Sequence, residues 1–279
     1  MSGEIAFTNT ALESFAALVT FVLLFACIAK IKMQRGVKHV TSKNAKRNTL
    51  DYILIIWLVI HMIVLTADVL SWTAMDFGKN EVWLLFMLNL TFTCLFLECM
   101  VYTYYVKETI YQHEMIGNTY VYLVMLSTVI AIILWITSDI SGKFYYLDTQ
   151  GNYTQGSMYW LCQFYCIIVM CGNIVILLKH RKALVRHDVL SLLMYGLIPI
   201  ASIPAQMLWK STTFNLATTL ALIYICISVH MAQYDRIVEQ EKLLIQQEHE
   251  LSMNQMQMMI AQIQPHFLYN SLTALAQLC

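Results

Sequence analysis

The chain has 279 residues, of which 59% are hydrophobic and 12% are charged, and its formal net charge is zero. Soluble domains carry about a quarter charged residues, so the composition argues against an ordinary soluble protein, and the charge balance gives no reason to expect a nucleic-acid partner. The apolar residues gather in runs of about twenty, the length that a helix needs to cross a lipid bilayer. We therefore predict an all-α integral membrane protein.

The apolar runs predict a seven-transmembrane helix bundle that occupies residues 1–233. The sixth run contains Pro199 and Pro204, which predict a kink because proline removes helix hydrogen bonds. The predicted spans are 11–31, 50–72, 82–106, 119–138, 158–179, 188–209 and 214–233. Seven of the eight cysteines lie inside these runs, which favours packing between helices over disulfide bonds. They are Cys27, Cys94, Cys99, Cys162, Cys166, Cys171 and Cys226.

The lysines and arginines predict how the bundle is oriented. Of the 17 Lys and Arg residues, only Lys79, Lys143 and Lys210 fall on one side of the predicted spans, and all the others fall on the opposite side. Because basic residues gather on the cytoplasmic side of membrane proteins, we expect the N-terminus outside and the C-terminal tail in the cytoplasm.

The connection at 141–157 differs from the other predicted connections. Aromatic residues lie on both sides of the turn-prone stretch 148–152, Asp-Thr-Gln-Gly-Asn. This pattern is typical of a small β-hairpin, which would cover the outer mouth of the bundle. A plain connector is the alternative.

Ionisable residues inside a span are costly and are candidates for function. His61 falls near the middle of the second span, and Glu98 lies about one helical turn deeper toward the cytoplasm. We do not predict that these two residues pair, because a similar depth does not by itself bring side chains together.

Two interpretations of the other polar residues stay open at this point. They could form an outward-opening pocket for an unidentified extracellular or membrane ligand, or they could simply hydrogen-bond neighbouring helices. The residues that would line the pocket are Asp68, Trp72, Asn89, Tyr159, Gln163 and Gln206.

A cytoplasmic stalk follows at 234–259. It lacks glycine and proline and is rich in helix-forming residues. One heptad column is apolar, and the column four residues later is polar. This predicts a weak parallel coiled coil, and so a homodimer, that could pass a rotation or a piston movement of the seventh span onward. An amphipathic helix on the membrane surface is the alternative, although the stretch has few cations. The apolar column is Ile237, Leu244, Leu251 and Met258, and the polar one is Glu241, Glu248, Gln255 and Gln262.

The last segment, 260–279, carries a histidine in a distinctive context. His266 follows Pro265, which cannot donate a helix hydrogen bond and could bend the backbone there. An imidazole titrates near neutrality and can accept a phosphoryl group on one nitrogen. Asn270 lies one turn later on the same helix face. Taken alone, a single histidine on a helix is more often structural than catalytic.

Residues 262–272, Gln-Ile-Gln-Pro-His-Phe-Leu-Tyr-Asn-Ser-Leu, closely resemble the H-box of the LytS-type sensor histidine kinases. The usual form of that box has Asn at the position of Gln264 and Phe at that of Tyr269. The resemblance implies a bacterial two-component kinase of the cytoplasmic membrane that signals to a cytoplasmic response regulator. It also implies that His266 is autophosphorylated and that Asn270 positions the phosphoryl group. The membrane part is similar, more loosely, to seven-helix input modules of bacterial histidine kinases and diguanylate cyclases.

Kinases of this family continue into a domain that binds ATP and Mg²⁺, and residues 260–279 do not supply one. The tail contains no glycine for a phosphate-binding loop, so we expect a truncated H-box helix that is inactive alone and binds neither cofactor nor metal. A seven-helix receptor or transporter without kinase output is the main alternative. A retinal protein would need a lysine in the seventh span, and 214–233 has none.

Overall fold

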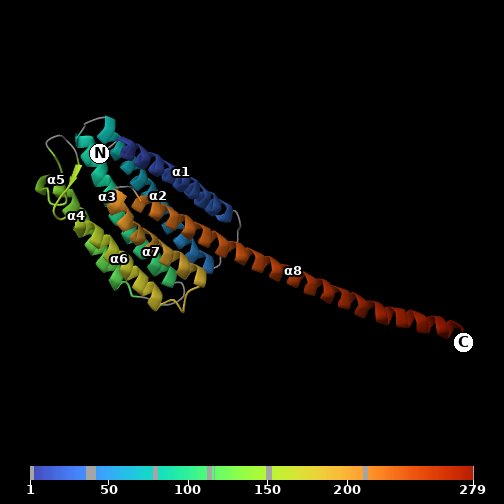
Figure 1. Ribbon diagram of the computed structural model, residues 1–279. Coiled ribbons are helices and arrows are strands. Elements are labelled where there is room, and N and C mark those ends of the chain that lie inside the picture. Colours follow the sequence, from blue (N-terminus) through green and yellow to red (C-terminus); the bar gives the residue numbers. More distant parts are fainter. Residues whose placement is uncertain are drawn as a thin grey trace. The chain divides into compact units, whose positions relative to one another are not determined.

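The computed structural model describes residues 3–35, 42–77, 81–111, 115, 117–148, 153–209 and 213–278, although not every side chain within them. Apart from short connections, these residues form helices and one two-stranded hairpin (Figure 1). The prediction of an all-α chain is therefore confirmed. The elements are α1 Gly3–Arg35, α2 Ser42–Phe77, α3 Glu81–Tyr111, α4 Thr119–Ile136, α5 Ser138–Ser141, β1 Tyr145–Leu147, β2 Tyr153–Gln155, α6 Trp160–Lys179, α7 Arg186–Trp209 and α8 Thr213–Leu278.

Seven stretches of the described residues are long and apolar enough to cross a membrane, which makes the chain a multi-pass membrane protein. They agree with the seven predicted spans. An apolar run of this length is best accommodated as a helix across the bilayer, because a helix satisfies its own backbone hydrogen bonds there. The stretches are Phe7–Lys32, Thr49–Thr73, Glu81–Tyr111, Thr119–Ser141, Trp160–Lys179, Arg186–Ala205 and Thr213–Met231.

Two compact units make up the chain, Met1–Ser228 and Val229–Cys279. In the first unit the long helices lie side by side (Figure 1). Helix α3 is central and contacts α2, α4 and α6, while α1 packs on α2 and α7 packs on α6. Between α2, α3 and α7 lies an aromatic cluster of Trp57, Tyr102 and Tyr195, each at most 1% exposed. The Trp57 and Tyr195 ring centroids are 4.5 Å apart, and the Tyr102 hydroxyl donates to the Leu192 carbonyl oxygen at 2.8 Å.

Helix α7 contains both Pro199 and Pro204 and nevertheless runs unbroken from Arg186 to Trp209. The predicted kink therefore does not divide this span into two helices. Membrane helices tolerate proline because neighbouring groups satisfy the carbonyls that proline leaves without a donor.

The predicted hairpin at 141–157 is present. Strand β1 pairs antiparallel with β2, and Tyr146 lies opposite Thr154. The Ser138 hydroxyl anchors the first strand, because its oxygen accepts from the backbone N–H groups of Phe144 and Tyr145 at 3.0 and 2.9 Å. Helix α5 ends at Gly142, whose φ of 64° is the left-handed conformation that glycine adopts without strain. The plain connector is thereby excluded.

Gly156 closes the base of the hairpin, and we expect Gly156→Ala to destabilise it. A Cβ at this position would lie 2.2 Å from the backbone oxygen of Lys143, which cannot move aside as a flexible side chain could. The overpacking should cost about 1–3 kcal/mol. Thermal unfolding in detergent and protease cleavage between β1 and β2 would measure this loss. Gly117→Ala is the matched control, since a Cβ there meets nothing within 4 Å. Equal behaviour of the two variants would contradict the prediction.

The described cysteines are all free, and six of the seven are buried. This confirms that they pack between helices, as their place inside the apolar runs predicted. Cys171 is the exposed exception.

In the second unit, Val229–Cys279, the described residues 229–278 form the later part of α8. The helix continues through the predicted stalk and through Pro265 to Leu278. Along it the apolar Leu244, Leu251 and Met258 are about three-fifths exposed. The helical conformation of residues 234–259 is thus confirmed, and their role as a stalk that pairs into a coiled coil stays a prediction.

Candidate functional site

Three buried polar side chains from three helices hydrogen-bond one another within the bundle. His61 of α2 is 0% exposed and lies at the middle of its span. Its Nδ1 is 2.8 Å from Oε1 of Glu98 in α3, and its Nε2 is 2.8 Å from Oγ1 of Thr219 in α8. Glu98 and Thr219 are almost as buried as His61. The ring therefore joins α2, α3 and α8 where water is scarce.

The aromatic cluster lies one helical turn from this set. Trp57 precedes His61 by four residues in α2, and Tyr102 follows Glu98 by four residues in α3, so each lies on the same helix face as its polar neighbour. Because these rings are fully buried, they close the polar set off from the end of the bundle where α2 begins and α3 ends.

Asn215 is the centre of a second polar set. Its Nδ2 donates to Oε1 of Glu13 in α1 at 3.1 Å and to Oδ2 of Asp68 in α2 at 2.7 Å. Its backbone oxygen accepts from the Thr219 hydroxyl at 2.8 Å. Asn215 thereby connects both sets, and a continuous chain of hydrogen bonds runs from Glu98 through α8 to Asp68.

A third polar set lies under the hairpin. The single hydrogen of the Tyr145 hydroxyl is shared between Asp139 and Oδ1 of Asn89, and Asn89 Nδ2 donates to Oδ2 of Asp139 at 3.1 Å. Burial raises the pKa of Tyr145, so its phenol stays protonated and remains a donor. These three side chains fix the hairpin to α3 and α5. They hydrogen-bond one another and do not face a cavity.

The six residues of the predicted pocket do not meet in one place. Asp68 belongs to the set around Asn215, and Asn89 belongs to the set under the hairpin. Tyr159 hydrogen-bonds Gln163 and Tyr153. The indole nitrogen of Trp72 is buried and has no hydrogen-bond partner among the described residues. The side chain of Gln206 lies outside the described residues.

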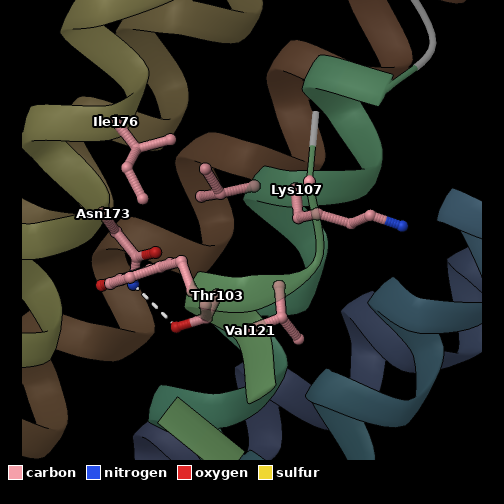
Figure 2. Close-up of a pocket in the computed structure, with 8 residues that line it drawn as sticks. Thr103, Lys107, Val121, Asn173 and Ile176 are labelled. Carbon is pink, nitrogen blue, oxygen red and sulfur yellow. Dashed lines mark hydrogen bonds between the residues drawn. The ribbon is translucent and has the colours of Figure 1, made fainter. Parts of the chain in front are cut away.

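A small pocket does lie between α3, α6 and the start of α4, as Figure 2 shows, but none of the predicted residues lines it. There Asn173 Nδ2 donates to Thr103 Oγ1 at 2.9 Å. The surrounding side chains include Val121 and Ile176, and Lys107 points its ammonium group away from the pocket (Figure 2). We regard the Asn173–Thr103 bond as a link between helices.

The expectation that His61 and Glu98 do not pair is wrong. A glutamate side chain is long enough to span the offset of about one turn between the two residues, and the close packing of α2 on α3 brings the two faces together. Three further members of the network were missed: Glu13, Asn215 and Thr219. Glu13 carried a signal, since it is an acidic residue within an apolar run. Thr219 carried none, because most membrane threonines bond only to their own helix.

His266 and Asn270, the residues singled out for phosphoryl transfer, both lie in α8. Asn270 is exposed, and the side chain of His266 lies outside the described residues. The comparisons with known proteins add no family: no model of a protein family matches the chain, and no curated protein matches it.

Proposed function

We propose that the chain is the membrane sensor and phosphoacceptor part of a two-component histidine kinase, with His266 as the acceptor and Asn270 as a positioning residue. The proposal rests on the observation that one helix, α8, contains both buried polar residues of the membrane bundle and the H-box sequence. This single helix holds Asn215 and Thr219 of the buried network within a membrane span, and the H-box sequence 262–272 in its later part. A change at the network thus acts on the same helix that bears the acceptor.

Exposed apolar residues in the H-box and the helical turn after it support a homodimer. Phe267, Leu272 and Leu275 are 60–70% exposed, although they lie beyond the last span, where the helix meets water. A helix covers such a stripe by packing against another helix. A second copy of the chain would supply that helix, and the apolar heptad column of the stalk would extend the contact.

ATP and Mg²⁺ enter this proposal through the kinase family. Residues 229–278 form a helix without a glycine and so offer no glycine-rich loop for phosphates. We therefore assign ATP and Mg²⁺ to a separate catalytic domain of the kinase. In this scheme the chain contributes the imidazole nitrogen that receives the phosphoryl group. A cytoplasmic response regulator takes it next.

The H-box resemblance supports a bacterial cytoplasmic-membrane location, and the distribution of Lys and Arg supports an orientation with the N-terminus outside and α8 ending in the cytoplasm. This orientation would put His266 on the side where ATP and a response regulator are found. The hairpin and the Asn215 set would then lie toward the outside.

Phosphate mapping would test the proposed function. Membranes that contain the product of the natural reading frame would be incubated with radiolabelled ATP, with a kinase catalytic domain added if the frame does not encode one. We expect a label that acid removes and alkali does not, as for phosphohistidine, on a proteolytic fragment that spans 260–279. A stable label elsewhere, or none, would refute the assignment.

A further inference from the structure

The hydrogen bonds around His61 define where its protons lie. A carbonyl oxygen cannot donate, so the Thr219 hydroxyl uses its one hydrogen in the bond to the Asn215 oxygen. The 2.8 Å contact between Thr219 Oγ1 and His61 Nε2 must then be donated by the ring. Nε2 therefore carries a hydrogen.

The contact between His61 Nδ1 and Glu98 Oε1 must also contain a hydrogen. At 2.8 Å, two lone pairs facing each other would repel. The hydrogen belongs either to an imidazolium beside a carboxylate or to a carboxylic acid beside a neutral ring. In both forms the pair as a whole is neutral, which is the state that a buried membrane site favours.

Few groups near the pair could offset a change in its charge. Tyr195 of α7 and the thiols of Cys94 and Cys99 in α3 interact with Glu98. On the other side, Asn215 links Thr219 to Glu13 of α1 and Asp68 of α2. None of these groups is a cation, so the proton held by the pair itself balances the charge of Glu98.

From this geometry we propose that the His61–Glu98 pair is a proton-binding site, and that the proton it binds is an input signal of the sensor. Its second part, that the proton is an input signal, rests on the proposed function, whereas proton binding alone does not require a kinase. It names the class of stimulus: a change in proton concentration, or in proton supply across the membrane.

Proton release would act directly on α8. When the pair gives one proton to water, the hydrogen between Nδ1 and Oε1 remains and the hydrogen on Nε2 is lost. The pair is then left with a single negative charge. Nε2 becomes an acceptor, so the Thr219 hydroxyl must turn from the Asn215 oxygen toward the ring. The Asn215 backbone oxygen then loses the hydrogen bond from Thr219 and keeps the one from Thr218. One proton thus rearranges the helix turn that holds α8 to α1 and α2.

The first measurement follows the ring itself. The chain would be reconstituted in lipid vesicles with nitrogen-labelled histidine and titrated by NMR over the whole pH range in which the bundle stays folded. We expect one histidine signal, absent from His61→Gln, to lose its Nε2 hydrogen as the pH rises. Glu98→Gln should displace this titration, because the amide cannot share the proton. Thr103→Val is the matched control: it removes the buried bond to Asn173 but no titratable group.

The second measurement follows the stalk. Disulfide crosslinking between copies that carry Leu251→Cys, with Cys279 replaced by serine, would be compared across the same pH range. Each yield would be divided by that of the same cysteine in His61→Gln at the same pH, because thiolate formation alone raises disulfide yield with pH. We expect this normalised yield to change on the order of fivefold, the lower end of common couplings between sites. Thr219→Val should leave the ring titration in place and make the normalised yield independent of pH. Thr219→Ser, which keeps the hydroxyl, should restore the response.

Two outcomes would overturn the inference: a His61 ring that does not change over this range, or a crosslinking response that persists in Thr219→Val. Neither readout uses phosphate. If both responded while His266 took up no phosphate, the proposed function would fail and the proton site would stand. If His266 were phosphorylated while the His61 ring stayed inert, the kinase would stand and the proton site would fail.

Discussion

His266→Gln should abolish phosphate incorporation into the chain. Glutamine is close to histidine in size and forms helices well, so α8 should persist. Its amide nitrogen, however, is not nucleophilic and cannot carry the phosphoryl group that an imidazole nitrogen accepts. Because removal of a covalent nucleophile leaves no alternative route, we expect the label to fall by a factor of about 10³ or more. Labelling of vesicles with radiolabelled ATP measures this directly.

His249→Gln is the matched control for that experiment. His249 lies in the same helix, is exposed, and lacks the H-box sequence around it. We expect this variant to be labelled as strongly as the natural chain. Equal labelling of the His266 variant would remove the basis for a kinase, whereas loss of label in both variants would indicate damage to the helix rather than to an acceptor.

Trp57→Ala should be among the most destabilising single changes in the bundle. The indole is 0% exposed, and its ring centroid lies 4.5–5.7 Å from those of Tyr195, Tyr105 and Tyr102. Truncation to alanine would leave a cavity between α2, α3 and α7, and a buried tryptophan lost in this way costs about 3–5 kcal/mol. Unfolding in mixed micelles with increasing denaturing detergent would report the difference.

Trp160→Ala serves as the comparison, because this indole is 54% exposed at the start of α6. Its removal changes mass and aromatic content in the same way but opens no cavity, so the unfolding midpoint should move little. If the two variants unfolded at the same detergent fraction, the aromatic cluster could not be the core of the bundle.

The membrane map could be predicted from sequence because its cause is local. About twenty apolar residues in a row are stable as a helix across the bilayer, and every predicted span coincides with a helix. The hairpin was also predictable, since aromatic residues on either side of a turn-prone stretch carry the signal themselves. Both features depend on the order of residues along one segment.

The polar network depends on how helices are rotated against one another, which a single sequence does not encode in any short pattern. Their positions along the predicted spans put His61 and Glu98 within about one helical turn of the same membrane depth. Only the packing of α2 on α3 shows that the two side chains face each other. Asn89 illustrates the reverse case. It was grouped with Asp68 by depth, but its helix face turns it toward the hairpin and Asp139.

Thr219 shows a further reason. Thr20, Thr91 and Thr109 each donate to a carbonyl oxygen four residues earlier in the same helix, as membrane threonines usually do. Thr219 makes the same bond to Asn215 and in addition accepts from His61. The second bond distinguishes it, and that bond comes from a residue 158 positions away.

The placement of the cysteines has a practical consequence for labelling experiments. The described thiols lie within the apolar spans, and six of the seven are buried. Thiol reagents react with the thiolate where water reaches it, and the interior of an apolar span does not offer that access. A charged, membrane-impermeant maleimide should therefore leave these thiols unmodified. Once Cys279, which lies outside the described residues, has been replaced, single cysteines introduced along the hairpin or the stalk would be the main thiols that such a reagent modifies.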